Sequence, residues 1–200
     1  MQTRRSLLLV AAALPAAGLL PRLAAAEPKL GDIVLGDPEA PVTVYEYASF
    51  TCPHCAAFHN NTFPEIEKNY IETGKVQFIL REVYFDRYGL WASMVARCGG
   101  ERGFYPMADQ FLKRQAVWTR SEDIAGEIRK IGRLNGLSPD AMEACLADED
   151  YARSLVERYQ ETADEHQVRS TPTFIINGAK HSGNMGVADF SALLDAALSG

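Results

Sequence analysis

Two cysteines, Cys52 and Cys55, are separated by two residues, so that their thiols can close a small disulfide ring. They follow the segment 42–48, which alternates in polarity and is rich in β-branched and aromatic residues, a pattern that predicts a strand. Pro53 stands at the first position of the predicted helix, a place that proline favours. Unpaired N–H groups and the helix dipole stabilise an anion at a helix N-terminus. Because the thiolate is the attacking species in disulfide exchange, this arrangement predicts redox chemistry.

The two cysteines are expected to play different parts in that exchange. Cys52, at the start of the helix, would form the mixed disulfide, and Cys55, one turn further on, would resolve it. His54, if protonated or donating an N–H, adds to the stabilisation of the Cys52 thiolate. Because a stable thiolate stabilises the reduced protein, it makes the disulfide a strong oxidant. The Pro53-His54 dipeptide is therefore expected to tune the redox potential.

A zinc half-site is the main chemical alternative for a C-x-x-C pair. Zinc needs two further ligands, and the remaining cysteines, Cys98 and Cys145, form no second pair of this spacing. His59 could be a third ligand, but its place in the helix predicts a solvated side chain. We therefore expect neither a metal ion nor another cofactor.

The strand and helix patterns fall into two halves with a helical region between them. The strand 42–48, a helix kinked at Pro64 and a second strand over 76–83 form a β–α–β unit, which implies parallel strands and a right-handed crossover. Strand character returns at 173–176, followed by an Asn177-Gly178 hairpin turn and a terminal helix. This order predicts an α/β protein.

Five helices are predicted between the two halves from hydrophobic period and capping residues. Gly99-Gly100 is expected to close the first, and Ser121 to cap the third. Cys98 and Cys145 lie on the apolar stripes of the first and fourth. The predicted helices cover, in order, residues 91–98, 104–115, 121–134, 138–146 and 150–165.

The N-terminal segment predicts export. Arg4 and Arg5 precede an apolar run of about 14 residues, and Ala24-Ala25-Ala26 offers a cleavage site, the pattern of a secretory signal peptide. The run is shorter than the roughly 20 residues that a membrane-spanning helix needs. The paired arginines also resemble a twin-arginine signal, so the general secretory and twin-arginine routes both stay open. Export would place the cysteines in an oxidising compartment, the periplasm, where disulfides persist.

Charge and hydropathy exclude two classes of partner. The formal net charge is −6 with no basic patch, so a nucleic-acid partner is not expected. No further apolar run is long enough to cross a bilayer, so stable membrane insertion is not expected either.

With these motifs in order, the sequence resembles the DsbA-like branch of the thioredoxin superfamily. The resemblance covers nearly the whole chain after the signal peptide. It rests on the approach segment Asp32–Val44, on Cys52-Pro53-His54-Cys55, and on Ser170–Gly178, which is similar to the cis-proline loop and following strand of the family. It implies a thioredoxin fold with a helical insertion, divided into a signal peptide (1–26), an N-terminal half (27–86), the insertion (87–166) and a C-terminal half (167–200).

The resemblance also implies roles for particular residues. Pro172 would be a cis-proline facing the cysteine pair, and the backbone of Thr171 would pair with an extended substrate peptide. Glu46, six residues before Cys52, would be the buried acid that assists proton transfer at Cys55; the alternative is an exposed strand residue. Threonine before this proline departs from the valine often seen in strong oxidants, and is seen in isomerases and thioredoxin-like relatives.

A second cysteine pair often occurs in the insertion of related chains. We therefore expect a structural disulfide between Cys98 and Cys145, the alternative being two buried free thiols. Such a bond contributes about 2–4 kcal/mol to stability.

The function implied is that of a monomeric periplasmic oxidoreductase that introduces disulfides into reduced or unfolded exported polypeptides and is reoxidised by a membrane partner resembling DsbB. An isomerase or reductase of the same fold is the first alternative. A redox-inert chaperone or binding module, with the C-x-x-C pair as a static staple, is the second.

Overall fold

The computed structural model describes residues 30–200, and the predicted signal peptide at residues 1–26 lies outside the described residues. Five strands form one sheet in the order β1-β3-β2-β4-β5. Strands β2 and β3 run parallel, and every other neighbouring pair is antiparallel. The strands are β1 (Val34–Leu35), β2 (Val42–Ala48), β3 (Val76–Glu82), β4 (Thr173–Ile176) and β5 (Ala179–Ser182).

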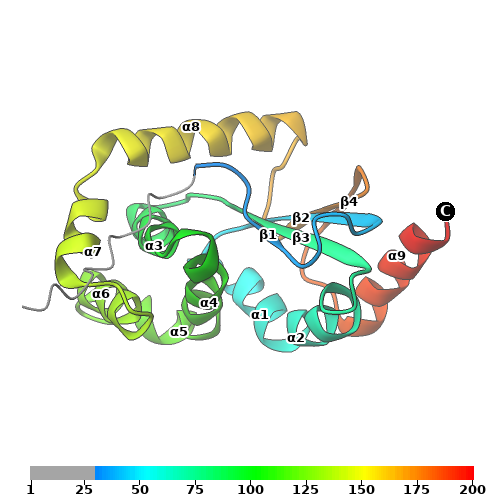
Figure 1. The fold of residues 1–200 in the computed structure, drawn as a ribbon, viewed down its shortest axis with the longest axis horizontal. Helices are drawn as coiled ribbons and strands as arrows, with labels where there is room; N and C mark the ends of the chain where they lie inside the picture. The colour runs from blue at the N-terminus through cyan, green and yellow to red at the C-terminus, as the bar shows by residue number, and fades with distance from the viewer. Residues whose placement is uncertain (1–29) are drawn as a thin grey trace, which may run out of the picture.

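Helices cover both faces of this sheet (Figure 1). The helices α1 (Pro53–Asn61) and α2 (Phe63–Ile66) lie on one face, together with the C-terminal helix α9 (Val187–Ser199). The long helix α8 (Glu149–Glu165) crosses the opposite face. The predicted α/β architecture with a helical insertion is confirmed.

The insertion is a cluster of helices beside the sheet (Figure 1). It joins β3 to α8, and its first helix packs against the next, as well as against α6 and α7. Its helices are α3 (Arg87–Cys98), α4 (Gly100–Lys113), α5 (Gln115–Trp118), α6 (Ile124–Leu134) and α7 (Pro139–Leu146).

Several predicted boundaries in the insertion are wrong. Gly99 is the C-cap of α3, as predicted, but α4 begins directly after it at Gly100, before the predicted start at Phe104, with a φ of +65° that a side chain would resist. The cap of α6 is Asp123, whose carboxylate accepts the Gly126 N–H at 2.8 Å, whereas the Ser121 hydroxyl accepts the Asp123 N–H, before the helix begins. The carboxylate prevails because a capping side chain must lie directly before the first helical turn.

The predicted helix after Pro64 is also interrupted. The segment Glu67–Ile71 forms a π-helical turn, and Gly74, with a φ of +71°, ends it. π-helical turns are rare in proteins, and those that occur within helices often lie at functional sites. The turn brings Glu67 next to α4, where it lines a cavity described below.

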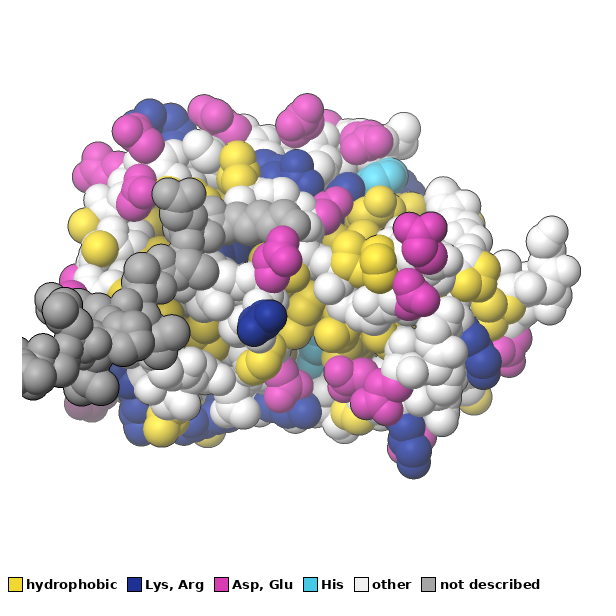
Figure 2. Space-filling view, in the orientation of Figure 1, with side chains coloured by type: hydrophobic (Ala, Val, Ile, Leu, Met, Phe, Trp, Pro, Cys, Tyr) yellow, Lys and Arg dark blue, Asp and Glu magenta, His cyan; other side chains and the backbone are white. Residues whose placement is uncertain are grey.

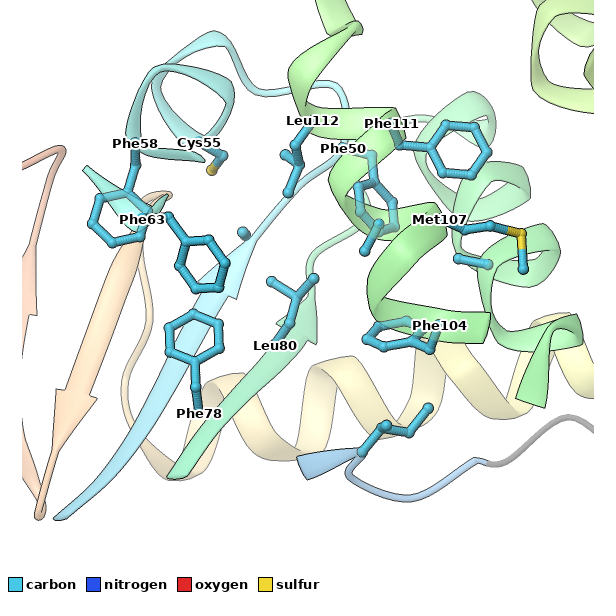
Figure 3. Packing of buried hydrophobic residues seen from close by; sticks show 14 of the residues in the cluster. Phe50, Cys55, Phe58, Phe63, Phe78, Leu80, Phe104, Met107, Phe111 and Leu112 are labelled. Atoms are coloured by element: carbon cyan, nitrogen blue, oxygen red, sulfur yellow. The ribbon is translucent and has the colours of Figure 1, made fainter. Parts of the chain in front are cut away.

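The core runs continuously from the sheet into the insertion. The ring of Phe58 contacts Phe174 of β4, and the ring of Phe63 contacts Phe78 of β3. Phe50 contacts Phe111 of α4. In Figure 3 the Cys55 side chain points from α1 into this cluster. The predicted helical insertion therefore shares one hydrophobic core with the α1 side of the sheet.

Strand β1, which the alternation of residues did not predict, lies at the edge of the sheet. It has two residues, Val34 and Leu35, too few for a pattern of period two to be recognised. None of the helices within residues 30–200 is long and apolar enough to cross a membrane. On the face drawn in Figure 2, acidic and basic side chains of the described residues are interspersed.

Candidate active site

The cysteine pair lies where β2 passes into α1. Cys52 is the N-cap residue in extended conformation, Pro53 occupies the first turn, and the Cys52 carbonyl accepts the first helical hydrogen bond from Ala56 at 3.1 Å. Both cysteines are free thiols; Cys52 is 8% exposed, and Cys55 is fully buried. His54 is exposed beside them. Only the Cys52 sulfur can therefore be reached from the surface.

The surroundings of Cys52 favour its thiolate. Hydrogen bonds from the Cys55 thiol, from the Thr171 side chain and from the backbone N–H groups of Cys55 and His54 outweigh burial and lower the pKa of Cys52 to about 5. Hydrogen bonds to the charged form of an acid lower its pKa in general. Cys52 is therefore ionised at neutral pH, the state required of an attacking sulfur or a leaving sulfur.

Cys55 is held in the opposite state. Its thiol donates toward Cys52, it is buried, and it lies close to the Glu46 charge, and together these effects raise its pKa far above the ordinary value. A thiol in this state needs a base to accept its proton before it can attack a mixed disulfide.

Glu46 lies in the middle of β2, paired with Leu80 of β3 and Phe174 of β4, and its side chain is fully buried. Its Oε2 atom lies 2.7 Å from Nε2 of His59, and its Oε1 atom has no hydrogen-bond partner among residues 30–200. His59 is 4% exposed, so the prediction of a solvated helix residue is wrong. Its position four residues after Cys55 places it on the inner face of α1, where Glu46 provides a buried polar partner.

The loop before β4 faces the cysteine pair. The Cys52 thiol lies 3.6 Å from the Thr171 carbonyl, and the Thr171–Pro172 peptide bond is cis. The Pro172 carbonyl accepts the Gly183 N–H at 2.8 Å, which ties the loop to the end of β5. Thr171 is half-buried and Pro172 is buried, so the structure brings both together with Cys52.

A hydrogen-bonded link next to Cys52 was not predicted. The Thr51 hydroxyl donates to Asp86 Oδ2 at 2.7 Å and also contacts the Ser49 hydroxyl at 3.1 Å. The other Asp86 oxygen caps α3 by accepting the N–H groups of Tyr88 and Gly89. The link fixes the loop before Cys52 to the first helix of the insertion. An aspartate directly before a helical pattern is a capping signal that could have identified part of it.

Cys98 and Cys145 lie away from this site. They are joined by a disulfide that connects α3 to α7, with their Cα atoms 6.4 Å apart. Within residues 30–200, no group of three or more His, Cys, Asp or Glu side chains could hold a metal ion.

A family model described as thioredoxin matches residues 29–196. A structure of Wolbachia pipientis alpha-DsbA1 superimposes with a TM-score of 0.78 at 30% identity, covering 86% of this chain and 93% of that one. The chain belongs to the DsbA-like branch of the thioredoxin superfamily. The implied fold and family are thereby confirmed.

Three sequence relatives show the extent of the likeness between this DsbA-like chain and known proteins. Disulfide bond formation protein D of Bacillus subtilis is 30% identical over 155 residues, which cover 74% of this chain and 68% of that protein. A Rickettsia bellii protein, provisionally named a protein-disulfide oxidoreductase, is 34% identical over 168 residues, or 84% of this chain. The matched region spans 64% of the length of the Rickettsia bellii protein and 60% of that of its Rickettsia conorii counterpart.

Proposed function

We propose that the chain is a periplasmic thiol–disulfide oxidoreductase that introduces disulfides into exported proteins through Cys52 and Cys55. The observation that carries the proposal is the contrast between the two sulfurs. The pKa of Cys52 is lowered to about 5, while Cys55 is buried and held as a thiol. This contrast separates an accessible sulfur that exchanges with substrate from a protected sulfur that resolves the intermediate.

The proposed reaction begins from the Cys52–Cys55 disulfide. A substrate thiolate attacks Cys52, the Cys52–Cys55 bond breaks, and the Cys55 sulfur takes up a proton. A second thiolate of the substrate then attacks the substrate sulfur of the mixed disulfide, and Cys52 leaves as a thiolate. The substrate gains a disulfide, and the enzyme gains two electrons and is left reduced. The low pKa of Cys52 favours this last step because a sulfur of lower pKa leaves faster.

Substrate binding is assigned to the loop that contains Thr171 and the cis-proline, Pro172. The Thr171 carbonyl lies next to the Cys52 sulfur, at 3.6 Å, where the chain flanking a substrate cysteine must pass. Its backbone would pair with an extended segment of a reduced polypeptide. Pro53 and His54, both exposed in the first turn of α1, complete the surface around Cys52.

The proposed cycle also needs export and reoxidation. The N-terminal segment is proposed to be a signal peptide directing the protein to the periplasm, with residues 27–86, 87–166 and 167–200 as the parts of the mature, monomeric protein. A membrane protein resembling DsbB would accept the two electrons from the reduced pair. The name of the Bacillus subtilis relative, a disulfide bond formation protein, supports the oxidative direction.

An isomerase or reductase of the same fold is the second candidate. The specific observation in its favour is Thr171, because threonine before the cis-proline is seen in isomerases and thioredoxin-like relatives. Isomerases of this kind usually oligomerise through an extra N-terminal region. A stable oligomer in solution would therefore favour the isomerase.

The test is disulfide formation in a reduced, unfolded substrate protein by the oxidised enzyme and by a Cys52→Ser variant. The oxidised enzyme is expected to transfer one disulfide per molecule, and the variant none. Full activity of Cys52→Ser would contradict the proposal and would favour a redox-inert binding module.

A further inference from the structure

His59, the partner of the buried Glu46, borders a cavity that the disulfide chemistry described so far does not use. The cavity measures about 300 Å³ and is lined by His59, by Glu67 of the π-helical turn and by Asp109 and Lys113 of α4. Apolar side chains of β1, β3, α2 and α4 make up most of the remaining wall. In Figure 2 hydrophobic side chains show near the middle of the molecule, with charged side chains around them.

The cavity opens on a different part of the surface from the cysteines. Its wall includes none of Cys52, His54, Thr171 or Pro172, the residues that would face a bound polypeptide. Its sheet residues, Leu35 and Leu80, lie within β1 and β3, whereas Cys52 follows the end of β2. A substrate seated on Cys52 would therefore leave this cavity open to water.

Proton exchange at Cys55 needs such an opening. In the reoxidation step, the Cys55 thiol loses a proton, attacks Cys52 and displaces the partner sulfur from the mixed disulfide. Cys55 is fully buried, and during this step Cys52 is covered by its partner. Glu46 is also fully buried, so a proton passed to Glu46 still has to reach water.

His59 connects Glu46 to the cavity. Its Nε2 atom lies 2.7 Å from Glu46 Oε2, and the side chain, 5% exposed, forms part of the cavity wall. The charged groups that face it are Glu46 on β2, Glu67 on the π-helical turn, and the Asp109–Lys113 ion pair on α4, with an Oδ1–Nζ distance of 2.8 Å. Burial and the nearby Asp109 and Glu72 charges raise the pKa of Glu67, so this rim carboxyl can carry a proton closer to neutral pH than an ordinary glutamate can.

We propose that His59 is a positioning and relay residue that holds Glu46 and passes protons between it and this cavity. Cys55 then exchanges its proton with water through the flank between α1 and α4, and not through the face that a substrate covers. The inference rests on the proposed disulfide exchange at Cys52 and Cys55 and adds the path of the proton. No electrons travel this path; the sulfur atoms exchange them directly.

The experiment follows the mixed disulfide between Cys52 and glutathione. The reduced protein is mixed with excess oxidised glutathione at about pH 7 and quenched with acid, and the mixed disulfide is quantified over time. In His59→Ala it should persist about tenfold longer than in the unmodified protein, because the proton of Cys55 leaves slowly. Added imidazole, which fits the cavity, should restore the original lifetime.

A second variant tests the cavity while the Glu46–His59 pair remains in place. Ala108 lines the cavity and is buried, so the ring of Ala108→Phe would occupy the path. This variant should also prolong the mixed disulfide about tenfold. Ala116→Phe, the same change at an exposed position of α5, is the matched control and should behave as the unmodified protein.

The outcomes separate the inference from the proposed function. A mixed disulfide that decays as fast in His59→Ala or in Ala108→Phe as in the unmodified protein would overturn the relay. A long-lived mixed disulfide in His59→Ala that imidazole does not shorten would also overturn it, because His59 would then have a structural role only. If one variant does not fold, the other decides. An unmodified protein that forms no mixed disulfide at Cys52 would contradict the proposed function itself.

Discussion

The Cys52 thiol faces the Thr171 carbonyl at 3.6 Å, across the gap between the first turn of α1 and the cis-proline loop. The two residues are 119 positions apart in the chain, and they meet because β2 and β4 are neighbours in the sheet. The sulfur proposed to react and the backbone proposed to hold the substrate thus lie at the same end of two neighbouring strands. The helical insertion leaves this arrangement intact while extending the surface beside it.

The first prediction concerns the ionisation of Cys52. Its thiolate absorbance in the reduced protein should titrate with a midpoint near pH 5. This pKa is lower in the folded protein than in an unfolded thiol, so ionisation of Cys52 raises the free energy of unfolding of the reduced form. That stabilisation is fully present above about pH 9 and is lost as the pH falls toward about 5. Urea unfolding of the reduced and oxidised proteins across this range measures the difference between them. A difference in the free energy of unfolding that does not change with pH would contradict the low pKa of Cys52. The reduced Cys52→Ser variant, which lacks this thiol, is the control.

The second prediction concerns Glu46. Its charge is one of the effects that raise the pKa of Cys55, so Glu46→Gln should lower that pKa and make Cys55 react faster with an alkylating reagent at a given pH. The comparison is made in a Cys52→Ser background, where Cys55 is the only thiol of the pair. Glu65→Gln, at an exposed position of α2, is the control. Identical alkylation profiles with and without the Glu46→Gln change would show that the charge does not act on Cys55.

The third prediction concerns the disulfide between Cys98 and Cys145. Peptide mapping of the purified protein without reductant should recover the two cysteines in one linked fragment. Replacing both by alanine should lower the free energy of unfolding by about 2–4 kcal/mol, because the bond closes a long loop between residues 47 positions apart. Thiol labelling of both cysteines in the unmodified, unreduced protein would exclude the bond.

The fourth prediction concerns a buried ion pair that anchors α3 to the sheet. Arg97 donates to both carboxylate oxygens of Glu82, each at 2.6 Å, and both side chains are 3% exposed. Arg97→Leu leaves Glu82 charged and buried, and should lower the free energy of unfolding by about 3–5 kcal/mol. Arg153→Leu, which removes an exposed pair with Asp150, should cost no more than about 1 kcal/mol. Equal effects of the two variants, measured by urea unfolding, would show that burial of the pair is unimportant.

Much of the fold could be predicted because its strongest signals are local. The β-branched run of β2, Pro53 at the helix start and the Asn177-Gly178 turn each specify their own conformation without reference to distant residues. The parallel pairing of β2 with β3 follows from the helix between them. These signals sufficed for the order of the elements and for the place of the cysteine pair.

The features that escaped prediction depend on contacts between distant elements. His59 is polar and lies in a helix with little amphipathic pattern, and only the position of Glu46 on the neighbouring strand explains its burial. The Thr51–Asp86 hydrogen bond likewise joins two loops 35 residues apart. The spacing of four residues between Cys55 and His59 was the one local signal, since it places both side chains on the same face of α1.

The most direct test of the account is the equilibrium of the Cys52–Cys55 disulfide with glutathione in the purified protein. A thiolate stabilised to a pKa of about 5 stabilises the reduced form, so we predict a redox potential near that of a strong oxidant such as DsbA, about −120 mV. A potential near the thioredoxin value of about −270 mV would contradict the proposed direction of transfer and would favour a reductase or isomerase.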